Sequence, residues 1–171
     1  MDINSVSRRR ASQILPQPEQ LRAAAVFSVP QPTLVATEAN YATDDRLVSR
    51  VKTQLETHSL PAANDEGVVI GLRGCLAAVT SHRLLLLERP WLRRRLRAQD
   101  VIIAAALDAC SVTWWIEDQA SPTAGIAHIS FGDGRFITLV TSPPTRWGRN
   151  DLQEFVSALG PRATQLPARH M

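Results

Sequence analysis

The chain has 171 residues, which is enough for one domain with extensions around a single hydrophobic core. Its 19 Lys and Arg against 16 Asp and Glu leave a formal charge of only +3, so the overall charge assigns no partner. Lys52 is the only lysine. A GC-rich genome accounts for this arginine bias most simply, although arginine also suits bidentate contacts to carboxylate or phosphate.

The two cysteines, Cys75 and Cys110, fall in apolar stretches and have no CxxC companion. They match neither a disulfide framework nor a zinc site, so we expect buried, reduced thiols. The apolar runs are far shorter than a transmembrane helix. Three arginines at positions 8–10 suggest a twin-arginine signal, but prolines at 16 and 18 interrupt the segment that follows. These features predict a cytoplasmic protein, whose contact with a membrane would be peripheral.

Residues 1–42 contain prolines at positions 16, 18, 30 and 32 among Gln, Ser, Thr and Ala, without sustained hydrophobic periodicity. This composition predicts a flexible, proline-rich N-terminal tail that serves as a tether. A short helix over about Glu19–Val26 is compatible with the sequence. The segment Gln31–Ala36 is compatible with pairing at an exposed sheet edge, but its residues do not require it.

An amphipathic helix is predicted within residues 43–60. Leu47, Val51 and Leu55 recur at i, i+4 and i+8 and form one apolar stripe. A threonine and two aspartates open its first turn, and a Leu-Pro pair ends it. We expect the helix to pack against the domain, because acidic residues among its few basic ones oppose binding to anionic lipid.

From Gly67 onward the pattern becomes that of β-strands. The expected strands lie near Val68–Arg73, Leu76–Thr80, Arg83–Arg89, Arg93–Ala98, Ile102–Leu107, Ser111–Glu117, Ile126–Phe131 and Phe136–Thr141. Gly132-Asp133-Gly134 predicts a hairpin between the last two, since Asp-Gly supplies the positive φ angles of such a turn. Alternation within a strand places Trp114 and Trp115 on opposite faces of the sheet.

A second amphipathic helix closes the domain. Its apolar residues fall at i, i+3, i+4 and i+7 and are Leu152, Phe155, Val156 and Leu159. Asn150, with a glutamine three residues on, resembles a capping box at the helix start, and Gly160-Pro161 is a stop signal. We expect this helix to plug an opening in the sheet. Residues 66–160 then form the domain, and residues 161–171 are predicted to be a disordered tail.

Three stretches carry a family resemblance. They are Val79-Thr80-Ser81-His82-Arg83-Leu84-Leu85, Ala98-Gln99-Asp100-Val101-Ile102 and the closing helix Leu152–Leu159. Together they resemble bacterial pleckstrin-homology-like (PH-like) domains over about residues 66–160. The resemblance implies an α+β, mainly β fold: a curved sheet or open barrel of about seven strands, capped by a C-terminal helix and preceded by one amphipathic helix. It also implies contact with a protein or membrane surface, without catalysis.

The first candidate binding surface is the arginine-rich segment that follows the strand Arg83–Arg89. In an extended chain Arg93, Arg95 and Arg97 share one face at intervals of about 6.6 Å, which suits contacts to neighbouring phosphates or carboxylates. Arg89 and Trp91 adjoin them, and an aromatic ring beside cations suits a lipid headgroup region. The alternative, to which we give more weight, is an edge strand protected by its charge.

The second candidate surface is Arg146-Trp147-Gly148-Arg149. An arginine beside an exposed tryptophan suits stacking on a base or on a partner side chain. A loop in which Trp147 packs over the start of the closing helix is the simpler interpretation. Both candidates are charge clusters, and neither pattern specifies a ligand.

No catalytic constellation is evident in the sequence. Cys75, His82 and Asp108 supply the residue types of a nucleophile, a base and an orienting acid, but nothing fixes their geometry. The four histidines lack metal-ligand spacing, and neither a P-loop nor a GxGxxG motif is present. We therefore expect no enzymatic activity, no metal and no cofactor.

The expected function is that of a binding or scaffold module, which contacts a protein partner or an anionic membrane surface through the PH-like domain. The alternative is a nucleic-acid-binding accessory protein that uses Arg93–Arg97 and Arg146–Arg149. Salt dependence separates the two in part, since binding dominated by phosphate contacts weakens steeply with added salt. The sequence names neither the partner nor the oligomeric state.

Overall fold

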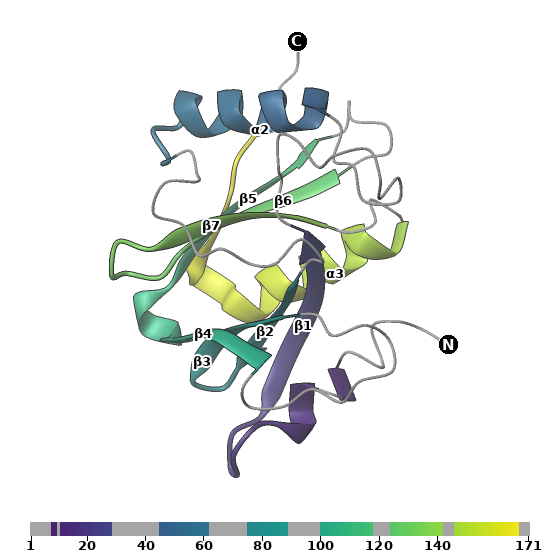
Figure 1. Ribbon diagram of the computed structural model, residues 1–171, viewed down its shortest axis with the longest axis vertical. Helices are drawn as coiled ribbons and strands as arrows, with labels where there is room; N and C mark the ends of the chain where they lie inside the picture. The colour runs from purple at the N-terminus through teal and green to yellow at the C-terminus, as the bar shows by residue number, and fades with distance from the viewer. Residues whose placement is uncertain are drawn as a thin grey trace.

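The part of the chain that the structure describes forms an eight-stranded sheet with a C-terminal helix (Figure 1). This computed structural model describes residues 8–9, 11–28, 45–61, 75–88, 100–117, 124–141 and 146–167. Its elements are β1 (Leu21–Ser28), α2 (Asp45–Thr57), β2 (Cys75–Thr80), β3 (Arg83–Glu88), β4 (Val101–Ala106), η2 (Leu107–Ala109), β5 (Ser111–Glu117), β6 (Ala124–Ser130), β7 (Phe136–Thr141), α3 (Arg146–Leu159), η3 (Gly160–Arg162) and β8 (Ala163–Gln165). The fold is α+β and mainly β, as predicted.

The strands follow the order β4-β3-β2-β1-β7-β6-β5-β8. Neighbouring strands are antiparallel except β5 and β8, which run parallel. Among the described strands β4 and β8 lie at the two edges, so the described part of the sheet does not close into a barrel. Figure 1 shows the two halves of the sheet, β4 to β1 and β7 to β5, on either side of α3.

The main core lies between the sheet and α3. Leu152, Phe155 and Leu159 of α3 are at most 1% exposed and belong to one buried cluster with residues of β1 to β7. The rings of Phe27 and Phe155 meet edge to face, with centroids 5.4 Å apart and planes at 70°. Burial of each such side chain contributes about 1.5–3 kcal/mol. The apolar face predicted for the closing helix therefore fills the opening between the two halves of the sheet.

α2 covers the opposite face of β5, β6 and β7. Its stripe of Leu47, Val51 and Leu55 packs in a second buried cluster that contains Trp115. Trp114, one residue earlier, packs on the main core instead. The predicted helix and the predicted placement of the two tryptophans on opposite faces are both confirmed.

Most of the predicted strands are found within a few residues of their expected limits. The strands expected near Val68–Arg73 and Arg93–Ala98 lie outside the described residues. The β6–β7 hairpin is confirmed: the Phe131 amide donates to the Arg135 carbonyl at 3.0 Å, and Gly132 and Gly134 have φ angles of +78° and +88°. The two glycines supply the positive φ angles of this turn.

The prediction of a flexible tail over residues 1–42 is wrong for residues 11–28. Residues 11–13 are helical and Leu21–Ser28 is β1, which pairs with both β2 and β7 in the middle of the sheet. The helix considered over Glu19–Val26 is wrong for the same reason. Ala23, Ala24 and Ala25 are at most 1% exposed, because β1 has packed layers on both faces. A strand buried on both faces has a continuous apolar run without alternation.

The prediction of a disordered tail over residues 161–171 is wrong for residues 161–167. Gly160–Arg162 forms the 3-10 turn η3, and Ala163–Gln165 forms β8 beside β5. The capping box at Asn150 is also wrong, because α3 already begins at Arg146 and Asn150 lies inside the helix.

Candidate interaction surface

The residues predicted to bind a partner fall mostly where the structure gives no side-chain description. Arg89, Trp91, Arg93, Arg95 and Arg97 lie outside the described residues. Arg146, Trp147 and Arg149 have helical backbone in the first turns of α3, so the loop expected there is replaced by helix. The candidate contact surfaces among the described residues therefore consist of other side chains.

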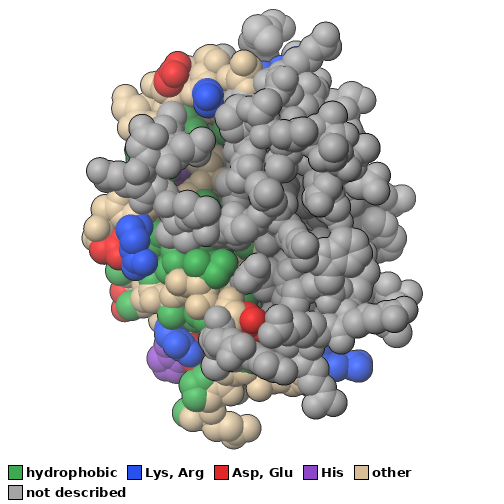
Figure 2. Space-filling view, in the orientation of Figure 1, with side chains coloured by type: hydrophobic (Ala, Val, Ile, Leu, Met, Phe, Trp, Pro, Cys, Tyr) green, Lys and Arg blue, Asp and Glu red, His purple; other side chains and the backbone are tan. Residues whose placement is uncertain are grey.

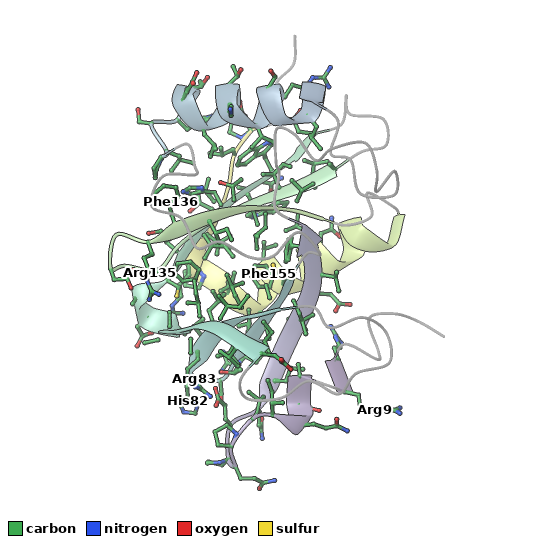
Figure 3. The ribbon with its side chains drawn as sticks, in the orientation of Figure 1. Arg9, His82, Arg83, Arg135, Phe136 and Phe155 are labelled. Carbon is green, nitrogen blue, oxygen red and sulfur yellow. The ribbon has the colours of Figure 1, made fainter. Side chains whose placement is uncertain are left out.

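The β2–β3 turn, where Figure 3 labels His82 and Arg83, carries a polar network. The carboxylate of Glu19 is at its centre. Arg83 donates through Nε at 3.0 Å and Nη2 at 2.6 Å to the two carboxylate oxygens of Glu19. The Thr80 hydroxyl also donates to this carboxylate, whose side chain is only 7% exposed. These hydrogen bonds, chiefly those from Arg83, lower the pKa of Glu19 below its ordinary value of 4.5. The network fixes the N-terminal segment to the hairpin just before β1 begins.

Two further ion pairs lie near the β2–β3 turn. One is on η2 and one on the β6–β7 turn, and these three segments form one rim of the sheet. The Leu107 amide donates to the His82 carbonyl at 2.9 Å, which joins η2 to the β2–β3 turn. On η2, Asp108 pairs with Arg162, and Asp133 in the β6–β7 turn pairs with Arg135 at 2.6 Å. Figure 2 shows cationic and acidic side chains together along this side of the molecule. The described arginines of this rim, Arg83, Arg135 and Arg162, are each paired with a carboxylate, so among the described residues the rim carries no unpaired positive charge of the kind typical of a nucleic-acid interface.

Among the described strands, β4 lies at one edge of the sheet. Its register with β3 shifts between Leu86 and Leu87, which leaves Ile102 as the extra residue of a bulge. Ile102 is 37% exposed and is the one large hydrophobic residue exposed in the described part of the chain. The strand Val101–Ala106 contains no charged residue and no proline, the features that usually protect an edge from strand addition. β4 is thus a candidate contact surface.

The other edge of the sheet holds an extended segment of the chain itself. β8 pairs with β5 over only three residues, and beyond it the Leu166 amide donates to the Trp114 carbonyl at 2.8 Å. Leu166 packs against the cluster made by α2 and the outer face of the sheet. At the other end of the segment, Arg162 pairs with Asp108. This packing of the C-terminal segment on α2 and the β5 edge was not predicted from the sequence.

The described titratable groups suit structural roles. His128 is 3% exposed, its Nδ1 lies 2.9 Å from the Thr138 hydroxyl, and burial lowers its pKa to about 4. Burial also raises the pKa of the Cys75 thiol to about 12, so it is not a nucleophile at neutral pH. Cys75 and His82 lie at opposite ends of β2, which separates the catalytic set considered from the sequence. Among the described residues no cluster of His, Cys, Asp or Glu is arranged to hold a metal.

Comparison with known proteins assigns no family. No family model and no curated protein matches the chain. Among solved structures the chain is similar to the hSac2 domain from human phosphoinositide phosphatase Sac2, at 12% identity over 97% of this chain and 89% of that chain, with a TM-score of 0.46. At this TM-score the likeness carries no argument about function. In the described residues no helix has the length and apolar character needed to cross a membrane.

Proposed function

We propose that the protein is a non-enzymatic interaction module of the PH-like kind that binds a protein partner at the open edge of β4. The exposed, uncharged edge strand with Ile102 at its bulge is the observation that carries this proposal. A curved sheet with one closing helix supports the PH-like assignment, since this is the layout that the family resemblance implies.

Strand addition is the mode of binding that suits such an edge. An extended segment of the partner would hydrogen-bond along β4, and an apolar side chain of the partner would cover Ile102. In the sequence, Arg93, Arg95 and Arg97 precede β4 by a few residues. A partner segment with acidic residues beside its apolar anchor therefore complements both features.

The test compares the full-length protein with its Ile102→Arg variant in affinity capture from the cells that make it. Gln153→Arg, which adds the same charge at an exposed position of α3, is the matched control. Each captured protein is then purified and titrated against the three chains. We expect Ile102→Arg to weaken binding at least about tenfold, since it places a charge in a desolvated contact, whereas Gln153→Arg binds like the wild type. Equal binding to all three chains would contradict the assignment to β4.

Two further titrations test the competing partner classes. Anionic liposomes and fluorescent DNA or RNA are mixed with the wild type and with the variant in which Arg93, Arg95 and Arg97 are all changed to Ser. We expect no association that depends on these arginines. Arginine-dependent sedimentation with liposomes would replace the protein partner by a membrane surface. Arginine-dependent nucleic-acid binding that weakens steeply with salt would replace it by nucleic acid.

A further inference from the structure

We propose that the first residues of β4 exchange between two registers against β3, and that this exchange decides whether Ile102 is presented to a partner. In the register of the structure Leu87 lies opposite Val101, and Ile102 is the extra residue of the bulge. In the second register the bulge is absent and Leu87 lies opposite Ile102. The consequence for binding rests on the proposed function, whereas the exchange itself rests only on how β3 and β4 pack.

The bulge separates two apolar residues of β4 that pack on opposite faces of the sheet. Ile103 belongs to the main core and lies opposite Leu86. Val101 packs on the other face, against an outer cluster of buried residues that consists of Ala11, Ala24, Val26, Leu76, Ala78, Leu85 and Leu87. In a regular strand two residues at i and i+2 point to the same face. The extra residue between Val101 and Ile103 therefore allows each to reach its own cluster.

Val101 and Ile102 compete for one position in the outer cluster, the position beside Leu87. Both are β-branched apolar residues, and they differ by a single methylene group. In the second register Ile102 packs beside Leu87, which is 0% exposed, and loses its own exposure of 37%. Each register therefore covers Leu87 with a side chain of similar size, which keeps the free-energy difference between the registers small.

The second register also has an apolar position for Val101. Without the bulge Val101 lies opposite Glu88, the last residue of β3, and its side chain turns to the face of the main core. Along this row of the sheet Cys75 is opposite Glu88 and Phe27 is opposite Cys75, and both belong to the main core. Residues Ile103–Ala106 keep their partners, so the slip is confined to one end of the strand.

The sequence of β4 does not hold one register. Val101–Ala106 reads Val-Ile-Ile-Ala-Ala-Ala and has no side chain whose chemistry requires a particular partner in β3. Among the described strands β4 pairs with β3 alone, so no second neighbour fixes its position. Register is weakly specified under these conditions.

A partner that covers Ile102 binds only the bulged register. Its binding shifts the population of β4 towards that register, and the fraction of bulged molecules in the free protein scales the observed affinity. The register is therefore an internal control on the β4 contact surface. Changes that favour Ile102 in the outer cluster should weaken binding without touching the partner.

Engineered disulfides report each register separately. Successive residues of a strand face opposite sides, so a thiol at Val101→Cys reaches one at Leu87→Cys only in the bulged register and one at Glu88→Cys only in the second. Leu85→Cys/Val101→Cys is the matched control, since Leu85 is opposite Val101 in neither register. All three double variants carry Cys75→Ala, because Cys75 lies opposite Glu88. The full-length variants are equilibrated in a glutathione buffer, and the intramolecular disulfide is measured by mass after alkylation.

We expect both Leu87→Cys/Val101→Cys and Glu88→Cys/Val101→Cys to form at least about tenfold more intramolecular disulfide than the control. The two yields together give the ratio of the registers. If Glu88→Cys/Val101→Cys forms no more disulfide than the control, the second register is not populated and the proposal is overturned.

A measurement without engineered thiols uses the Ile102 methyl group. Val101→Ala weakens the competitor for the position beside Leu87, so Ile102 should move into the outer cluster. In NMR spectra with a soluble gadolinium chelate, we expect the relaxation enhancement of the Ile102 δ1 methyl to fall at least about threefold in Val101→Ala. Val101→Ile, which keeps a large side chain in that position, is the control and should match the wild type. Equal enhancement in all three chains would contradict the slip.

The effect on binding is measured with the protein captured and purified by means of the wild-type chain. The oxidised Leu87→Cys/Val101→Cys variant should bind it as the wild type does, and the oxidised Glu88→Cys/Val101→Cys variant at least about tenfold more weakly. Equal affinity of the two locked chains would refute control by the register. Failure of the proposed function gives a different result: Ile102→Arg then has no effect on binding, while the disulfide yields still decide whether β4 exchanges.

Discussion

Acidification is expected to destabilise the protein through His128. In the folded chain this histidine is 3% exposed, and burial lowers its pKa from 6.5 to about 4. The unfolded chain binds a proton near the ordinary value, so between these two pH values the unfolded state holds more protons than the folded one. The stability that depends on a neutral His128 is therefore fully present above about pH 6.5 and is lost as the pH falls towards 4.

The size of the loss follows from the two pKa values. Linkage between about 6.5 and about 4 gives a cost of about 2 kcal/mol at pH 5 and about 3 kcal/mol at pH 4. A single domain has a total stability of about 5–15 kcal/mol, so this one group changes a large fraction of it. The Thr138 hydroxyl 2.9 Å from Nδ1 offers a neutral partner and no charge to compensate imidazolium.

Urea unfolding followed by tryptophan fluorescence at several pH values measures the effect. His128→Gln keeps a neutral polar group near Thr138 but removes the titration, and His82→Gln, at an exposed histidine, is the control. Wild type and His82→Gln should lose about 2 kcal/mol between pH 7 and pH 5, and His128→Gln should lose much less. If wild type and His128→Gln lose stability in parallel over this interval, the burial argument for His128 is refuted.

Two further substitutions test contacts that fix the fold. Glu19→Gln should lower the free energy of unfolding by about 1–2 kcal/mol in urea denaturation at neutral pH, because it weakens a nearly buried acceptor of the Arg83 hydrogen bonds. The Arg83 side chain is itself 37% exposed, and this exposure limits the loss. The pKa of Glu19 is lowered, so this difference should shrink as the pH falls below about 4.5. Gly132→Ala should lower stability more than Gly134→Ala, although both glycines have positive φ angles. A Cβ atom at Gly132 would lie 2.6 Å from the Ala109 carbonyl oxygen, whereas one at Gly134 would meet nothing within 4 Å. Equal melting temperatures for these two alanine variants would contradict the close approach of the hairpin to η2.

The elements with a clear local period could be predicted from the sequence. α2 and the core-facing stripe of α3 follow from apolar spacing, and β5 and β7 match their predicted limits. The β6–β7 hairpin follows from its glycines. In each case the signal lies within a few residues, so no knowledge of distant neighbours is required.

The candidate contact surfaces could not be predicted from the sequence as well as the fold class. The arginines within residues 93–97 form a charge cluster that any sequence shows directly, whereas the position of β4 at the edge of the described sheet depends on the order of the strands. Ile102 looks like an ordinary strand residue, and its exposure depends on the bulge opposite β3. One signal for β1 was available: the run Ala23–Phe27 between prolines fits a strand buried on both faces.

Local side-chain periodicity encodes the class of fold, because the strands, the β6–β7 hairpin and the two amphipathic helices each depend on residues close together in the chain. Tertiary structure alone decided that β1 enters the middle of the sheet and that β8 joins its edge. Both placements depend on backbone pairing with strands far away in the chain, as when Phe27 lies opposite Cys75 and Thr164 opposite Thr113. Backbone hydrogen bonds carry no residue signature, so such non-local pairing leaves little trace in the sequence of either partner.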